Sequence, residues 1–166
     1  MSVMEHKSQE LQVNVMVITI SDTRTTLNDK SGQKMIDLLE QSGHRIVAYK
    51  IVKDESALID QAVRNGCKNE QVQAVLLNGG TGIAQRDVTF EVLQGLIEKP
   101  LPGFGELFRL LSFQQIGTAA MLSRAIAGIA GRTVIFSTPG SINAVTLAME
   151  KLILPELSHI IRELHK

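Results

Sequence analysis

Three glycines that follow an apolar segment form the strongest chemical motif in this chain. Gly79, Gly80 and Gly82 lie, with Thr81 between them, in the segment NGGTGIAQRD at residues 78–87. Residues without a side chain let backbone N–H groups approach an anion closely, and a threonine hydroxyl adds one more donor. The motif has neither the Lys-Ser/Thr ending of a P-loop nor the GxGxxG spacing of a dinucleotide site. It fits a phosphate-binding loop and a tight strand-to-helix turn equally well.

Two aspartates stand where a metal ion would assist phosphate chemistry. Asp87 ends the glycine-rich segment, and Asp54 follows a second apolar segment. Mg²⁺ is bound by one or two carboxylates together with substrate phosphates, so an acid beside a phosphate loop could be a magnesium ligand. Each aspartate also suits a helix N-cap, Asp87 before Val88 and Asp54 in competition with Glu55 or Ser56. Taken singly, both residues fit capping more often than metal binding.

Other candidate ligand-binding residues also follow apolar segments. Ser21 and Asp22, in TISDTR, fit a ligand loop or a simple Asx or Ser turn. The loop STPGS at 137–141 offers amides and hydroxyls to an anion or a ring amide, and equally fits a capped turn. The segment PGFGELFR fits a mobile cover over the ligand. It also fits a helix start with a surface ion pair between Glu106 and Arg109.

Alternating strand and helix patterns predict the elements that position these residues. Apolar, β-branched segments predict strands at 13–20, 45–52, 74–77 and 133–136. Helical patterns occur at 31–42, 57–65 and 89–97, from about 106, and in a long final helix. We expect Ser31 and Ser141 to cap the first and last helices, Gly43 and Gly66 to end the first two, and Pro155 to kink the last.

This alternation predicts an α/β fold, a three-layer sandwich with a mostly parallel central sheet and helices on both faces. In such sheets ligands bind beyond the carboxyl ends of the strands. The polar loops after the strands should therefore converge on one edge.

Composition limits the classes of function that are open to the chain. Its 166 residues, 44% of them hydrophobic, suit one domain at 13–166 after a flexible polar arm at 1–12. Equal numbers of basic and acidic residues, 17 each, argue against a nucleic-acid partner, as does the scarcity of aromatic residues. No apolar run reaches the roughly 20 residues of a membrane span, and the polar start lacks a signal core, so we expect a cytoplasmic protein. We expect the lone Cys67 to have no role, and the four histidines, which lack zinc spacing, to lie on the surface.

Taken together, the motifs resemble the molybdopterin-binding MoaB/MogA family. SDTR, NGGTG, RDVT-x-E, PGFGE-x-FR, SRA-x-AG (Ser123 to Gly128) and PGS occur in the family's order, between about Val13 and Leu157. The segment LFRLLSFQQIGTAAMLSRAIAG is closer to the B branch than to the MogA branch. The resemblance implies binding of molybdopterin, a pterin with a dithiolene and a terminal phosphate. It also implies adenylylation of that phosphate with ATP and Mg²⁺, release of pyrophosphate, and a homo-oligomer, either a trimer or a hexamer.

The family's functional residues carry over to matching positions of this chain. Asp54 and Asp87 match its two essential aspartates, which imply catalytic and metal-binding roles. The residues that match its substrate-binding loops are Ser21, Asp22, Gly79, Gly80, Thr81, Gly82, Glu106, Ser123, Pro139, Gly140 and Ser141.

The chain departs from the family pattern at one position. The family commonly has Thr-Pro-Glu where this chain has Thr89-Phe90-Glu91, which removes a fixed φ at a helix start. Some B-branch proteins also lack adenylyltransferase activity. Retention of both aspartates favours an enzyme. The alternatives are a non-catalytic molybdopterin-binding or carrier protein and, third, an assembly subunit whose loops are structural.

Overall fold

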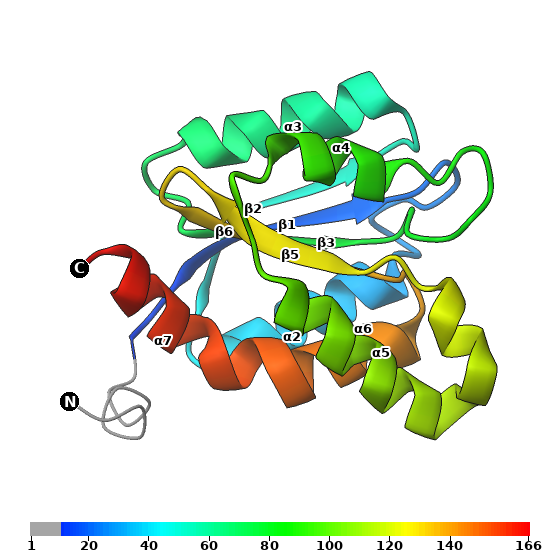
Figure 1. Ribbon diagram of the computed structural model, residues 1–166. Coiled ribbons are helices and arrows are strands. Elements are labelled where there is room, and N and C mark those ends of the chain that lie inside the picture. Colours follow the sequence, from blue (N-terminus) through cyan, green and yellow to red (C-terminus); the bar gives the residue numbers. More distant parts are fainter. Residues whose placement is uncertain (1–10) are drawn as a thin grey trace.

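A six-stranded sheet forms the centre of the fold (Figure 1), which this computed structural model describes for residues 11–166. Residues 1–10 of the expected N-terminal arm lie outside the described residues. The strands, in their order across the sheet, are β2 (Arg45–Val52), β1 (Asn14–Ile20), β3 (Ala74–Asn78), β6 (Thr133–Thr138), β5 (Ile126–Ala130) and β4 (Lys99–Pro100). The first four are mutually parallel, β5 is antiparallel to β6, and β4 is antiparallel to β5. The prediction of a mostly parallel sheet is confirmed, and β4 and β5 are additions to it.

Helices cover both faces of the sheet and produce the predicted three layers (Figure 1). One face carries α3 (Ser56–Lys68) and α4 (Thr89–Leu96). The other carries α2 (Lys30–Gln41), α5 (Pro102–Ile116) with the following 3-10 helix η1 (Gly117–Leu122), α6 (Ile142–Ala148), the π-helical segment η2 (Met149–Ile153) and α7 (Leu154–Leu164). Within residues 11–166, the helices are too short or too polar for any of them to cross a membrane.

The core is divided into two halves by the sheet, because successive residues of a strand point to opposite faces. In β1, Val15 and Val17 pack in the half beneath α2, α5, α6 and α7. Met16 and Ile18 pack in the half beneath α3 and α4. Both faces of β1 and β3 are buried, which explains why these parallel strands are nearly continuous apolar runs rather than alternating ones.

Some helix ends lie at residues other than the predicted ones. Asp29, not Ser31, caps α2, because its carboxylate accepts a hydrogen bond from a backbone N–H in the first turn. Gly66 does not end α3. It lies inside that helix, where a Cβ would approach Met16 Sδ to 2.8 Å and Val75 Cγ2 to 3.0 Å, so the absence of a side chain lets the helix pack closely on the sheet. Gly43 does end α2, in a left-handed conformation with φ +84°.

The last helical stretch begins as predicted, with the Ser141 side chain capping α6 by accepting from the Ala144 N–H at 3.1 Å. It is then interrupted by the wide turn of η2, and Pro155, which lacks an N–H, lies in the first turn of α7. The prediction of surface histidines is wrong for His44. That side chain is buried, and its Nδ1 accepts a hydrogen bond from the Val13 N–H at 3.1 Å.

Candidate functional site

A pocket of about 650 Å³ lies where the carboxyl ends of β1, β2, β3 and β6 meet, and we call it the strand-end pocket. The parallel pairing of these strands places their following loops side by side, as expected for this fold class. The predicted site residues that line the pocket are Ser21, Asp22, Asp54, Gly79, Gly80, Thr81, Gly82, Asp87, Ser123, Pro139, Gly140 and Ser141.

The glycine-rich loop after β3 presents unpaired amides. The carbonyl oxygens of the four residues 79–82 all accept hydrogen bonds from Thr89 or Arg124. The peptide groups are trans, so each following N–H points in the opposite direction from its carbonyl. Within residues 11–166, the N–H groups of residues 80–83 donate to no other protein group. Consecutive unpaired amides are a feature of backbone anion-binding sites.

Asp54 has a buried carboxylate oxygen without a partner. Its Oδ1 makes no hydrogen bond within the described residues, and a Cβ on Gly80 would approach that oxygen to 3.0 Å. Burial raises the pKa of Asp54, and the charges of Asp22 and Asp87 raise it further, while Arg86 opposes them. Such a site favours a bound cation or a proton.

Asp87 lies on the other side of the same loop. Its Oδ2 accepts from the Ala84 N–H at 3.1 Å, and a Cβ on Gly82 would come within 2.7 Å of that oxygen. Neither aspartate caps a helix, since the N-cap positions of α3 and α4 belong to Glu55 and Val88. The capping alternative is therefore wrong for both acids.

Two carboxylates in one pocket suit a magnesium ion shared with a phosphorylated ligand. Among residues 11–166 no three His, Cys, Asp or Glu side chains gather into a metal-binding group. Mg²⁺ commonly takes only one or two carboxylates and completes its coordination with water and substrate oxygens. The unpaired Oδ1 of Asp54 is the oxygen that such an ion would satisfy.

Asp22 links three of the strand-end loops. Its carboxylate pairs with Arg86, with Nε at 2.8 Å and Nη2 at 3.0 Å, and it accepts from the Asp54 N–H at 3.1 Å. The hydrogen bond from Arg86 lowers the pKa of Asp22 below its ordinary value. The carboxylate is therefore charged and joins the loops that follow β1, β2 and β3.

The pocket also contains an arginine that the sequence did not single out. Arg24 lines it and donates to the Gly140 carbonyl at 3.0 Å and to Ser31. One Nη lies 3.6 Å from Oδ1 of the fully buried Asp29, which is held in turn by Thr19 and neighbouring groups. Arg24 stands in the quoted SDTR motif, but the buried acid that anchors it lies outside that motif.

One wall of the strand-end pocket is largely apolar and comes from the α5 side. Its residues are Phe108, Ser112, Ile116, Ala119, Ala120 and Leu122. Helical periodicity can predict the buried members of α5, but not that the end of this helix meets the strand loops. The pocket thus has a polar, charged side at the loops and an apolar side suited to a ring.

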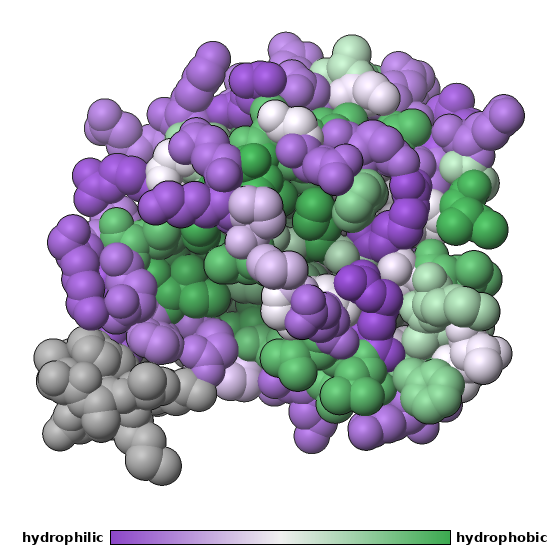
Figure 2. Space-filling model, viewed as in Figure 1, coloured by the Kyte–Doolittle hydropathy of each residue, from purple (hydrophilic) through white to green (hydrophobic). Residues whose placement is uncertain are grey.

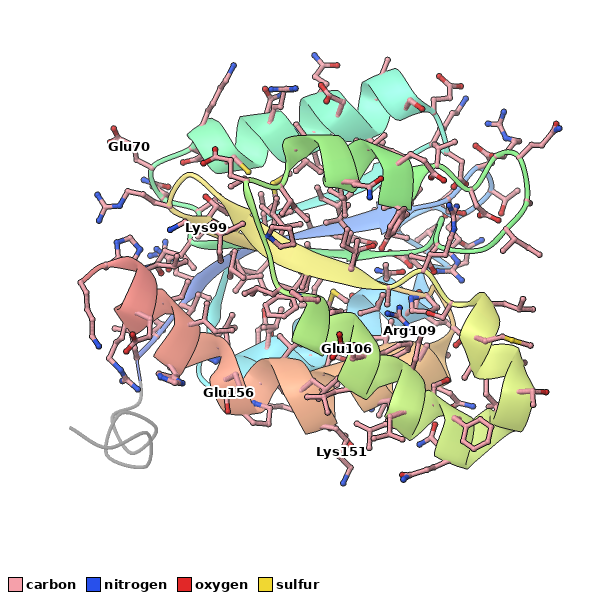
Figure 3. All side chains as sticks on the ribbon, in the orientation of Figure 1. Glu70, Lys99, Glu106, Arg109, Lys151 and Glu156 are labelled. Atoms are coloured by element: carbon pink, nitrogen blue, oxygen red, sulfur yellow. The ribbon has the colours of Figure 1, made fainter. Side chains whose placement is uncertain are left out.

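Glu106 is the predicted site residue that does not reach the strand-end pocket. It is exposed on α5 and lines a separate pocket of about 260 Å³, together with Arg109 (Figure 3). Arg109 donates to the carbonyls of Ser123 and Ala125, at 3.4 and 3.3 Å, and forms no ion pair with Glu106. Within one chain, a substrate contact from Glu106 has no support, and its role stays a prediction.

Comparisons with known proteins agree with this arrangement. Residues 16–159 match the family described as "Probable molybdopterin binding domain". Molybdenum cofactor biosynthesis protein B of Bacillus subtilis is 58% identical over 168 residues, which cover 100% of this chain and 99% of the relative. A crystal structure of a molybdenum cofactor biosynthesis protein B superposes with a TM-score of 0.92 at 56% identity, covering 93% of this chain and 97% of that one. The tungsten cofactor synthesizing protein MoaB of Pyrococcus furiosus superposes with a TM-score of 0.85 at 37% identity, with 95% and 100% covered.

Proposed function

Since the chain belongs to the molybdopterin-binding MoaB/MogA family of molybdenum cofactor biosynthesis proteins, we propose that it adenylylates molybdopterin. Molybdopterin would bind in the strand-end pocket with its terminal phosphate against the glycine-rich loop. The second substrate is ATP, and the products are adenylyl-molybdopterin and pyrophosphate. Magnesium is the metal that the proposal requires.

The observation that carries the proposal is the unpartnered Oδ1 of Asp54 beside a loop of unpaired amides. A buried carboxylate oxygen without a partner costs free energy, as does a set of amides without acceptors. A phosphate together with a cation would satisfy both groups at once. The volume of the pocket, about 650 Å³, is in the range of small-molecule sites.

The residues present fit a magnesium ion, and Asp54 and Asp87 would hold it. When bound, Mg²⁺ supplies positive charge that offsets the repulsion between two phosphorylated substrates. Gly80, Thr81 and Gly82 would hold phosphate oxygens through their N–H groups. Arg24, kept in place by Asp29, adds a fixed positive charge to the pocket.

The reaction needs no protein nucleophile. An oxygen of the molybdopterin phosphate forms a bond to the α-phosphorus of ATP, and the bond from that phosphorus to the bridging oxygen of the β-phosphate breaks. Pyrophosphate leaves with the electron pair. The chain's contribution is to hold the two phosphates in line and to stabilise their charge, the usual means of catalysis in phosphoryl-type transfer. The apolar wall from α5 and η1 would exclude water from the pterin or adenine ring.

Pyrophosphate release from purified protein with molybdopterin, ATP and Mg²⁺ tests the proposal. Asp54→Asn and Asp87→Asn should each lower the rate by on the order of 100-fold or more. Asp60→Asn is the matched control, because Asp60 is a partly exposed acid on α3 that pairs with Arg64 away from the pocket. Wild-type protein that binds molybdopterin without releasing pyrophosphate would instead be a non-catalytic carrier. Full activity of Asp87→Asn would refute the catalytic assignment.

Exposed apolar side chains support the accompanying prediction of a homo-oligomer. They gather on α5 and η1, in the lower right of Figure 2, and include Leu107, Leu110, Phe113, Ile116, Met121 and Leu122. A patch of this kind on a folded domain is typical of a protein–protein contact. A trimer or hexamer remains the expected state.

A further inference from the structure

The carbonyls of the glycine-rich loop accept hydrogen bonds from two residues that do not line the strand-end pocket. The first is Thr89, which is fully buried at the start of α4. Its hydroxyl donates to the Gly79 carbonyl at 3.3 Å, and its backbone N–H donates to the Gly80 carbonyl at 3.3 Å. Thr89 therefore donates a hydrogen bond to each of the first two carbonyls of the loop.

The second residue is Arg124, which lies between η1 and β5. Its backbone N–H donates to the Thr81 carbonyl at 3.1 Å, and its Nε donates to the Gly82 carbonyl at 2.9 Å. Its Nη2 donates to the carbonyl of Asp87 at 2.7 Å. One guanidinium thus joins the two ends of the segment 82–87, and both bonds are charge-assisted.

The side chain of Arg124 is itself fixed by two neighbours from α4. It forms an ion pair with Glu91, and its Cζ lies 5.5 Å from the centre of the Phe90 ring. Phe90 is the residue that replaces the family's proline, so the departure supplies a stacking surface for this arginine. Only 26% of the Arg124 side chain is exposed.

These contacts determine which way the loop amides face. A trans peptide places its carbonyl and its N–H on opposite sides. Because the carbonyls of residues 79–82 are drawn toward Thr89 and Arg124, the N–H groups of residues 80–83 are turned away from both. A peptide flip at any of these positions would replace an amide donor by a carbonyl oxygen, which repels an anion.

We propose that Arg124 and Thr89 are positioning residues, which hold the loop amides in the orientation that binds a substrate phosphate. The identity of that phosphate rests on the proposed function, whereas the orientation of the loop does not. Neither residue lines the pocket in which that phosphate would bind. Arg124 also holds the backbone of Asp87, so its loss disturbs the amides and that acid together.

Calorimetric binding of inorganic pyrophosphate, in the presence and absence of Mg²⁺, tests the proposal in the full chain. Arg124→Gln should bind pyrophosphate at least roughly ten-fold more weakly than wild type, because two charge-assisted bonds to the loop are lost. Thr89→Val should weaken binding in the same direction, and Thr89→Ser, which keeps the hydroxyl, should restore it. Arg64→Gln is the matched control, since it removes an arginine on α3 that pairs with Asp60 and does not line the strand-end pocket, and it should bind within about two-fold of wild type.

The amide resonances of residues 80–83 provide a second measurement, made on the folded, ligand-free variants. Arg124→Gln should shift them and raise their hydrogen-exchange rates, and Arg64→Gln should not. Unchanged pyrophosphate affinity and unchanged loop amides in Arg124→Gln would overturn the proposal. If wild type binds pyrophosphate, Arg124→Gln does not, and neither forms adenylyl-molybdopterin, then the positioning role holds and the proposed reaction fails.

Discussion

Replacing Gly80 by alanine tests the conformation on which the proposed anion site depends. Gly80 has φ +69°, in the left-handed region, and a Cβ there would overlap Thr89 Oγ1 and come within 3.0 Å of Asp54 Oδ1. The left-handed conformation costs an alanine about 1–2 kcal/mol. Displacing the Thr89 hydroxyl from its bond to the Gly79 carbonyl costs about 1 kcal/mol more.

The two contributions lower the free energy of unfolding by about 2–3 kcal/mol. For a domain of this size, each kcal/mol corresponds to a Tm change of about 2–4 °C, so Gly80→Ala should melt roughly 5–10 °C below wild type. Pyrophosphate binding should weaken as well, because the altered residue carries one of the loop amides. Differential scanning calorimetry and binding calorimetry provide the two readouts.

Gly95→Ala is the matched control for this measurement. Gly95 lies near the end of α4, its φ is not in the left-handed region, and a Cβ there would meet no atom within 4 Å. Alanine in an open helical position stabilises by about 0.5–1 kcal/mol, so this variant should melt at or slightly above the wild-type temperature. If Gly80→Ala melted with Gly95→Ala rather than well below it, the loop conformation described for Gly80 would be refuted.

Two further substitutions separate stability from activity at the acids. Asp54→Asn should be more stable than wild type near pH 7, because the fold opposes ionisation of Asp54. The difference should shrink as the pH falls through the raised pKa and vanish below the ordinary value of 3.8, which thermal melts between pH 3 and 8 at roughly one-unit steps would follow. Equal melting temperatures at neutral pH would contradict this reasoning. Gly82→Ala should lose pyrophosphate release, because its Cβ would lie 2.7 Å from Asp87 Oδ2 and would push that carboxylate away. The variant should lose less than about 1 kcal/mol of stability, since Gly82 does not have a positive φ. An active Gly82→Ala would show that Asp87 need not occupy its observed position.

The sequence alone predicted the central part of the fold and most of the candidate pocket, because both depend on local patterns. β-Branched runs predicted β1, β2, β3 and β6, and the rule that ligands bind beyond parallel strand ends predicted that their loops would converge. Among the candidate site residues, Asp54 had the weakest sequence support for metal binding, since an acid before a helix is more often a cap. Its place in the pocket follows from the end of β2, not from the helix that comes after it.

The remaining features depend on contacts between distant segments. The apolar pattern of β5, which contains small residues, is too weak to predict a strand. These residues form a strand because they pair with β6. Glu106 stands in a motif that suggests a ligand contact, but the rotation of α5 turns it to a different pocket. Ser31 has the residue type of a cap, but Asp29 takes that place because Thr19 and Tyr49 hold its carboxylate.

What the sequence by itself determined was which residue types follow each strand, and therefore that glycine-rich backbone and carboxylates would meet at one edge of the sheet. Only the tertiary structure decided which way the loop peptides face. Arg124 is separated from Gly82 by more than forty positions, and it lies beside the loop because the adjoining strand β5 pairs with β6. A peptide's orientation depends on the partner of its carbonyl, and that partner is a long-range contact that no local pattern encodes.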